Sequence, residues 1–448
     1  MRQMGFILGK SLEKRSTRVS FIFAVFLFFL TVFTRLPFAT KYLFVWDAGT
    51  VALGTRHYDI ALHQPHPPGY VLYVLFAKLL NYIFGDVNDA LVGVSILAAA
   101  GAAVFLYLLG KEMYGERVGI IASLFLIFGK IFWAYSEIAV GYTVQCFFAV
   151  LVIYLGYRFL KNRPRKYYLY LGSIALAVAG GFRQDLIFFL LPFWIFLTYK
   201  FAKDHFWKVW ILIAAICFVW FLGMVFWTGG LREYFGALFT QIGYVSGFSV
   251  GGRGLLGLVD NYRQGLLFLD DAIKGFSLVI FFAGYLFFPK KIAGDVRLKI
   301  LLFWILPSAI FYIFVHIGER GYLLTFVPAL LVVLAQGLVW FADELRDIFR
   351  FNVISSIFLV IISVLIITYN GYFFIGTKEF LSASFLKSQE NYIAWEIDHI
   401  RAADPARVNF IDEENFKQLH YYLPQYGIYS KSEQVPNDGR LTEDITPK

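Results

Sequence analysis

One short stretch of the chain carries the residues best suited to chemistry. Asp47 stands in residues 45–49 (Val-Trp-Asp-Ala-Gly) and is followed by Arg56, His57 and His66. A carboxylate can deprotonate a hydroxyl, and general-base catalysis of this kind typically contributes ~10² to 10⁴ in rate. Arginine and histidinium can hold the charge of a phosphate. The stretch therefore predicts a site where Asp47 acts on a hydroxyl beside a bound anion, although Asp47 could instead cap the helix that follows it.

Other polar residues stand where long apolar runs end. An ionisable side chain at membrane depth costs about 2.5 to 3.5 kcal/mol on insertion scales, so each is a candidate for function. Structural roles stay open: Arg183 could pair with Asp185, Arg320 with Glu319, and a single tyrosine is often an interfacial anchor. The candidates are His66, Tyr70, Glu137, Arg183, Arg320 and Tyr322.

Metal and disulfide chemistry is not indicated. His57, His63 and His66 lie close together, but their spacing matches no recognisable zinc pattern. Cys146 and Cys217 both lie inside apolar runs. We therefore assign no metal ligand, and a divalent metal stays open as a cofactor.

The composition predicts the elements that must position these residues. Of 448 residues, 59% are hydrophobic and 16% charged, against about 25% charged in a soluble domain. Mean hydropathy is +0.65, which excludes a soluble enzyme and a disordered chain. The net charge of +9 is not read as nucleic-acid binding, because in membrane proteins the position of the charges matters more. We predict an all-α, multi-pass integral membrane protein.

Eleven apolar segments approach the roughly 17 to 25 residues that a spanning helix needs. A further apolar segment, 67–84, opens with two prolines and contains Lys78 and Asn81, and we predict that it lies on or dips into the outer face. The eleven segments are 19–34, 90–109, 118–134, 139–157, 167–181, 186–199, 208–227, 273–288, 300–316, 322–341 and 353–375.

Basic residues predict the orientation. With 67–84 outside the count of crossings, loops on the side of the N-terminus hold 21 Lys and Arg, and the loops on the other side, with Lys78 and the tail 376–448 left out of the count, hold eight. Cytoplasmic loops retain positive charge, so we predict a protein of the cell membrane with its N-terminus inside and its C-terminus outside. No small-residue cleavage motif follows the first apolar run, which indicates an anchor and not a removed signal peptide.

This orientation places three long segments outside: 35–89, 228–272 and 376–448. The second contains glycines around Arg253 and is predicted to be a mobile loop, since it lacks the Gly-Lys-Ser/Thr of a phosphate-binding loop. The third is predicted to be a small α/β domain, separate from a transmembrane domain at 1–375. Its expected elements are helices at 385–402 and 415–423 and strands at 408–411 and 427–429.

The order of these features resembles a known family. An acidic residue beyond the first spanning helix, the run His-Pro-Pro-Gly-Tyr at 66–70, and a late Arg320-x-Tyr322 followed by Pro328 are similar to the GT-C superfamily of polyprenyl-phosphate-sugar-dependent glycosyltransferases. Residues 66–73 most resemble the branch of the protein O-mannosyltransferases. The resemblance covers roughly residues 19–340 and implies a GT-C-type helical bundle.

The resemblance also implies roles for individual residues. Asp47 matches the catalytic base, His66 a polar residue near the donor phosphate, and Arg183 and Arg320 the phosphate-binding cations. Many relatives have a second acid where this chain has Ala48, and Glu137 is the residue nearest to an acid that relatives carry after a later crossing. Arg56, His57, Tyr70 and Tyr322 are further substrate-binding candidates.

We therefore expect transfer of a sugar from a polyprenyl-phosphate donor to a hydroxyl of a glycan, lipid or protein. One inverting displacement at the outer face requires no second carboxylate as nucleophile. A secondary transporter or lipid-glycan flippase is the alternative, although it typically shows two related halves and polar residues near the midplane. A non-catalytic assembly subunit would explain the tail but not the polar residues.

Overall fold

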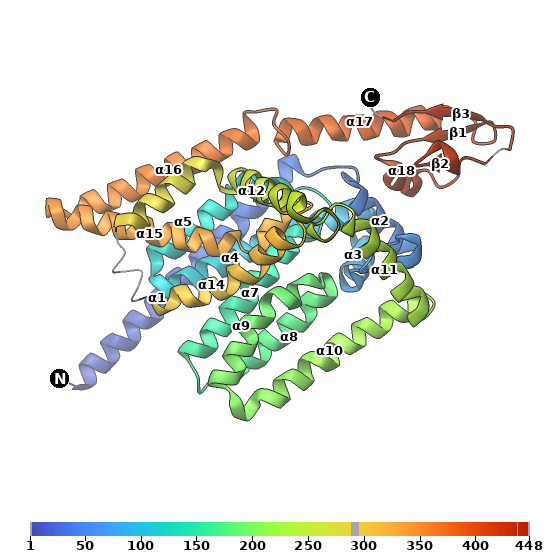
Figure 1. The fold of residues 1–448 in the computed structure, drawn as a ribbon. Helices are drawn as coiled ribbons and strands as arrows, with labels where there is room; N and C mark the ends of the chain where they lie inside the picture. Colours follow the sequence, from blue (N-terminus) through green and yellow to red (C-terminus); the bar gives the residue numbers. More distant parts are fainter. Residues whose placement is uncertain (1, 288–294, 437, 447–448) are drawn as a thin grey trace.

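The computed structural model describes residues 2–287, 295–436 and 438–446, the side chains of 2–17, 275–287 and 352 excepted. The described chain is mostly helical (Figure 1), and short 3-10 turns join several helices. The helices are α1 (Arg2–Arg35), α2 (Trp46–Arg56), α3 (Val71–Phe84), α4 (Val87–Tyr114), α5 (Glu116–Ile127), α6 (Lys130–Tyr135), α7 (Tyr142–Lys161), α8 (Tyr167–Phe182), α9 (Asp185–Phe201), α10 (Phe206–Trp227), α11 (Leu231–Ser246), α12 (Val250–Phe287), α14 (Val296–Phe314), α15 (Val327–Phe349), α16 (Asn352–Ile375), α17 (Ala383–Arg401) and α18 (Phe416–Tyr422).

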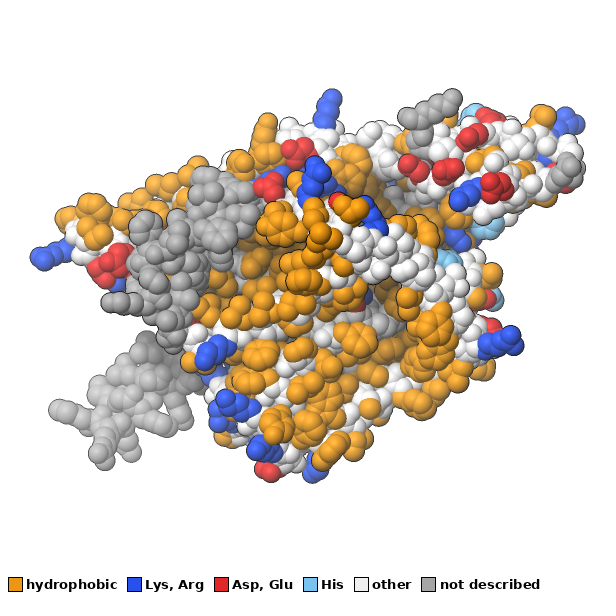
Figure 2. All heavy atoms as spheres, viewed as in Figure 1, with side chains coloured by type: hydrophobic (Ala, Val, Ile, Leu, Met, Phe, Trp, Pro, Cys, Tyr) orange, Lys and Arg blue, Asp and Glu red, His pale blue; other side chains and the backbone are white. Residues whose placement is uncertain are grey.

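Seven helices among the described residues are long and apolar enough to span a membrane. They are the second part of α1 with its following turn, and α4, α7, α10, α14, α15 and α16. The spans of α4, α7 and α15 are mostly buried, whereas α1 and α10 are mostly exposed, so the former make the centre of the bundle. Hydrophobic side chains cover most of the face seen in Figure 2. The chain is a multi-pass membrane protein, as predicted.

The other four predicted crossings are shorter or interrupted. Residues 118–134 form α5 and α6, separated at Phe128 and Gly129, and α8 and α9 have 16 and 17 residues. Residues 273–288 include the end of α12 beyond a kink at Lys274, and residue 288 lies outside the described residues. The count of eleven and the orientation therefore stay predictions.

The segment predicted not to cross forms α3, with only 14 residues. At 1.5 Å per residue it is about 21 Å long, less than the ~30 Å hydrocarbon core. It packs against α2, α4 and α8. This length agrees with a segment that does not cross the membrane, and its place beside the outer face stays a prediction.

The long segment 228–272 is helical, and the prediction of a mobile loop is wrong for most of it. Helix α11 is followed by a break at residues 247–249 and then by α12, which kinks at Gly254. The φ of Gly254 is +55°, a left-handed conformation that glycine adopts readily. The glycines thus bend a helical segment.

The tail forms α17, strands β1 (Val408–Ile411), β2 (Gly427–Tyr429) and β3 (Leu441–Asp444), and α18 between β1 and β2. The three strands are parallel in the order β2-β1-β3. The predicted helices and the first two strands are confirmed to within two residues, and β3 was missed because its four residues are all exposed. Figure 1 shows the sheet and α18 at one end of the molecule beside α2.

Candidate active site

A cavity of about 580 Å³ opens between the ends of α2, α9 and α14 and the helix α11. Asp47, His66, Tyr70, Arg183 and Tyr322, five of the residues singled out from the sequence, line it together. Asp47, His66, Tyr70 and Arg183 also line a small adjoining chamber of about 30 Å³. Residues that are far apart in the chain therefore converge on one space, as the predicted site requires.

Asp47 lies in the first turn of α2, where the helix dipole favours a negative charge. Its side chain is 44% exposed, and Oδ1 lies 3.7 Å from His66 Nδ1. Thr50 Oγ1 donates to the Asp47 carbonyl at 2.8 Å and lies 3.0 Å from the same imidazole nitrogen. The Thr50 hydroxyl uses its single proton for the Asp47 carbonyl, so His66 Nδ1 must carry a proton and donate to Thr50 Oγ1. The other ring nitrogen, Nε2, then has no proton and can accept a hydrogen bond. His66 thus orients the part of α2 that carries Asp47.

The His66 ring is held between Trp46 and Tyr70, with centroid distances of 5.6 and 4.9 Å. Burial lowers the pKa of His66, the Asp47 carboxylate raises it and Arg183 lowers it, and the net direction is down. The imidazole is therefore neutral at pH 7.

Arg183 follows α8, and its Nε donates to both carboxylate oxygens of Asp185 at 3.0 and 3.2 Å. The guanidinium lies 5.0 and 5.1 Å from the ring centroids of Tyr142 and Tyr322. Its two Nη groups have no hydrogen-bond partner within the described ranges. Arg183 is therefore held from one side, and its two Nη groups remain as donors for a ligand anion.

Two further carboxylates line the cavity: Asp185, in the first turn of α9, and Glu319. Burial raises the pKa of Glu319, and the charge of Asp47 raises it further. Tyr135 donates a weak hydrogen bond to Glu319 at 3.4 Å. Sequence reasoning treated Asp185 and Glu319 only as partners of arginines, although both stand at the ends of apolar runs like the residues that were chosen.

The structure places the other predicted residues outside this cavity. Arg56 stacks on Tyr421 at 3.9 Å and donates to its carbonyl, and His57 is exposed at the end of α2. Glu137 is fully buried near Arg35, and burial holds its pKa well above the usual range against the charge of Arg35. A direct substrate contact of Arg56, His57 or Glu137 is not supported by this geometry.

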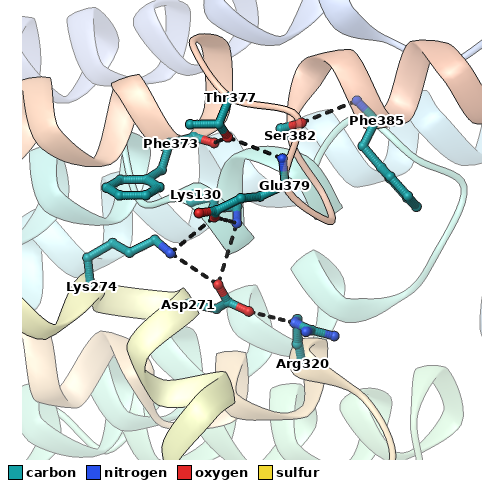
Figure 3. A network of polar contacts seen from close by, with 9 residues as sticks. All are labelled: Lys130, Asp271, Lys274, Arg320, Phe373, Thr377, Glu379, Ser382 and Phe385. Atoms are coloured by element: carbon teal, nitrogen blue, oxygen red, sulfur yellow. Dashed lines mark hydrogen bonds and ion pairs between the residues drawn. The ribbon is translucent and has the colours of Figure 1, made fainter.

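Arg320 belongs to a charge network next to the cavity (Figure 3). Its Nε donates to Asp271 at 2.7 Å, and its guanidinium lies between the rings of Phe268 and Phe380. The network also contains Lys130, Lys274 and Glu379, which join α6, α12 and the segment after α16. Burial of Asp271 raises its pKa, but the surrounding cations hold the net pKa below the ordinary value. Contact of Arg320 with a lipid phosphate stays a prediction.

Helix α18 packs directly on α2, a contact that the sequence did not indicate. A Cβ on Gly49 would lie 2.8 Å from Gln418 N and 2.9 Å from Lys417 C, so only glycine permits this approach. Around it, Leu43 N donates to Tyr422 Oη at 2.9 Å. When the oxygen and nitrogen of the Gln418 amide are exchanged, the nitrogen donates to the Asn415 carbonyl and the oxygen accepts from Trp46 N at 3.3 Å. The first turn of α2 has no side-chain cap of its own, so the tail completes the helix that carries Asp47.

Metal ligands are not gathered at the site. Within the part of the chain that the structure describes, no group of three or more His, Cys, Asp or Glu side chains could hold a metal ion. The described residues therefore do not fit a zinc ion, the metal present in one of the solved structures compared below.

Comparison with known proteins supports the same assignment of fold. The family model described as dolichyl-phosphate-mannose-protein mannosyltransferase matches residues 65–227, which include His66 and Arg183. No curated protein sequence matches the chain. The predicted resemblance to the mannosyltransferase branch is confirmed over residues 65–227 by this match.

ArnT from Cupriavidus metallidurans, solved bound to undecaprenyl phosphate, has a TM-score of 0.56 at 11% identity, over 95% of this chain and 89% of that one. The oligosaccharyltransferase AglB from Archaeoglobus fulgidus, solved with an inhibitory peptide and a dolichol-phosphate, has a TM-score of 0.54 at 13% identity, over 92% and 64%. The same archaeal enzyme solved with Zn and sulfate gives 0.52 at 16% identity, over 90% and 62%. The chain spans less than two thirds of the archaeal enzyme. At these identities the structures show a shared fold and nothing further.

Proposed function

We propose that this multi-pass membrane protein, with its GT-C fold and its match to the mannosyltransferase family, transfers a sugar from a polyprenyl-phosphate donor to an acceptor hydroxyl. The observation that carries the proposal is the convergence of Asp47 and Arg183 on one cavity at the end of the helical bundle. Relatives of the same fold were solved with undecaprenyl phosphate and with dolichol-phosphate. A lipid phosphate entering this cavity would meet the free Nη groups of Arg183.

The proposed reaction is a single inverting displacement. The acceptor oxygen forms a bond to the anomeric carbon of the sugar while the bond from that carbon to the phosphate oxygen breaks. Asp47 takes the proton of the acceptor hydroxyl, and the electron pair of the broken bond leaves with the lipid phosphate. Arg183 stabilises the departing charge, which needs little protonation because phosphate is a weak base.

The neighbouring residues position these two. His66 and Thr50 fix the Asp47 end of α2, and Asp185 fixes the Arg183 guanidinium from the side away from its Nη groups. We assign to Arg320 the task of holding the turn that carries Glu319 and Tyr322, through its ion pair with Asp271. Helix α11 supplies Gln241 and Tyr244 to the opposite wall, and the break after it supplies Ser249; the acceptor would bind there.

The test is sugar transfer by the full chain reconstituted in vesicles, with radiolabelled polyprenyl-phosphate mannose as the donor probe. Asp47→Asn should fold normally and lose transfer by at least 10²-fold, because it removes the base. Asp59→Asn is the matched control, since Asp59 lies in the same outer segment but caps a 3-10 turn outside the cavity. Full activity of Asp47→Asn would remove Asp47 from the mechanism.

The rival function is transport or flipping of a lipid-linked sugar. It predicts movement of the labelled donor between leaflets without a new glycosidic bond. Mass spectrometry of the donor and the acceptor after incubation with the reconstituted protein separates the two, because only a transferase forms a new glycosidic bond to the acceptor, whereas a flippase leaves the donor intact.

A further inference from the structure

A second large cavity lies far from Asp47, in the groove between α1, α4 and α7, which we call the α1–α4–α7 groove. It has a volume of about 700 Å³, within the range of ligand sites, and α4 packs against both flanking helices. Helix α4 begins at Val87 beside the outer segment, and Lys111 of the groove comes 24 residues later. At 1.5 Å per residue this is about 36 Å, so the groove opens in the opposite leaflet.

On each of the three helices, the polar lining residues of the groove lie nearer the membrane surface than the less polar ones. The polar residues Ser20, Lys111 and Arg158 lie toward the membrane surface, and Phe28, Val104 and Tyr154 lie deeper. On α1 the lining runs from Ser20 to Phe28, or about 12 Å, most of the ~15 Å depth of one leaflet. A slot that is charged at the surface and apolar below it has the profile of a membrane lipid.

The charge at the mouth of the groove is positive. Arg158 and Lys161 share the carboxylate of Glu112, and Lys111 pairs with Glu116. These three cations face two acids, which leaves one net positive charge at the mouth. The basic residues Arg163, Arg165 and Lys166 follow immediately after α7. Such basic pockets between helices at the membrane surface bind anionic headgroups.

We propose that the α1–α4–α7 groove binds one glycerophospholipid with an anionic headgroup, with its phosphate at Lys111 and Arg158 and an acyl chain against Phe28, Val104 and Tyr154. The charge of the mouth favours this occupant over a zwitterionic lipid. The length of the slot favours an acyl chain over the much longer polyprenyl chain. The inference does not depend on the proposed function, and it gives the basic loop after α7 a role beyond orienting the chain.

The test is native mass spectrometry of the full chain, released from bilayers of equal parts phosphatidylglycerol and phosphatidylcholine. The intact protein should retain one phosphatidylglycerol at least fivefold more often than phosphatidylcholine. Ala24→Trp fills the apolar part of the groove and should lower this retention about tenfold, whereas Ile22→Trp, on the exposed face of the same helix, should not change it. Lys111→Gln should keep a bound lipid but lose the preference for phosphatidylglycerol.

Equal retention of phosphatidylglycerol by the two tryptophan variants would overturn the proposal. It would also be overturned if the intact protein showed no preference for phosphatidylglycerol, or if added polyprenyl phosphate displaced the bound lipid. If Ala24→Trp fails to fold, as judged by size-exclusion chromatography, the intact protein is cross-linked with phosphatidylglycerol that carries a photoreactive acyl chain. Adducts on the groove-lining residues of α1, α4 and α7 support the site, and adducts confined to other helices refute it.

Discussion

The contact between α18 and α2 makes a sharp prediction about Gly49. Gly49→Ala should gain up to ~1 kcal/mol in helix propensity, because alanine is the better helix former. The added Cβ would, however, lie 2.8 and 2.9 Å from backbone atoms of Gln418 and Lys417, and backbone cannot rotate away as a side-chain end can. Helix α18 must then retreat by about 0.6 Å to reach an ordinary contact of 3.4 Å. Overpacking of this kind costs about 1 to 3 kcal/mol.

The retreat should also disturb catalysis, because Gln418 binds the first turn of the helix that carries Asp47. A misplacement of ~1 Å can cost about 10²-fold in rate, so a shift of about half that size should lower kcat roughly tenfold while the KM for the donor changes little. The control is Gly236→Ala in α11, where a Cβ would meet nothing within 4 Å and only the gain in helix propensity remains. Sugar transfer gives kcat, and hydrogen exchange of α2 and α18 reports the contact. Unchanged kcat together with unchanged exchange in Gly49→Ala would refute the role of α18.

Three further predictions concern single charges. Arg183→Lys keeps the charge but loses the planar pair of Nη donors, so the KM for the donor should rise about tenfold or more, given ~1.5 to 3 kcal/mol for a charged hydrogen bond; an equal effect on the acceptor KM would indicate a structural role instead. Asp271→Asn removes the carboxylate that pairs with Lys130, Lys274 and Arg320, and Glu379 still pairs with only the two lysines, so the free energy of unfolding should fall by about 1 to 3 kcal/mol, discounted for partial exposure; denaturation in detergent measures it, and a neutral result would exclude the network as a stabilising element. Burial, together with the Asp412 carboxylate, raises the pKa of Glu396 in the tail to about 9. The protonated Glu396 side chain therefore stabilises the folded state fully below about pH 4.3, and this stabilisation is lost as the pH rises toward 9. Melting curves of the full chain, followed in the tail, should show a melting temperature that falls as the pH rises. Glu396→Gln should remove this pH dependence, and a pH-independent melting temperature of the unaltered protein would contradict the raised pKa of Glu396.

Much of the site was predictable because membrane insertion sorts residues by local sequence. Asp47, His66, Tyr70, Arg183 and Tyr322 each follow or flank an apolar run, and all of them line the same cavity. Glu137 and Arg320 met the same criterion and do not line it. The sequence locates both at helix ends, but the direction in which a side chain points depends on its neighbours. Arg320 is turned toward Asp271, a residue 49 positions away, and Glu137 is enclosed beside Arg35.

Hydropathy and turn chemistry act over a few residues, so the class of protein, the helical segments, the α/β tail and the polar residues at helix ends could all be predicted from local sequence. Which of those polar residues share a cavity depends on how α2, α9, α11 and α14 pack, and it became visible only in the folded chain. The folded chain likewise revealed that Gln418 binds the first turn of α2 across more than 370 positions. Contacts between segments so distant follow from shape and packing density, and no local pattern in either segment encodes its partner.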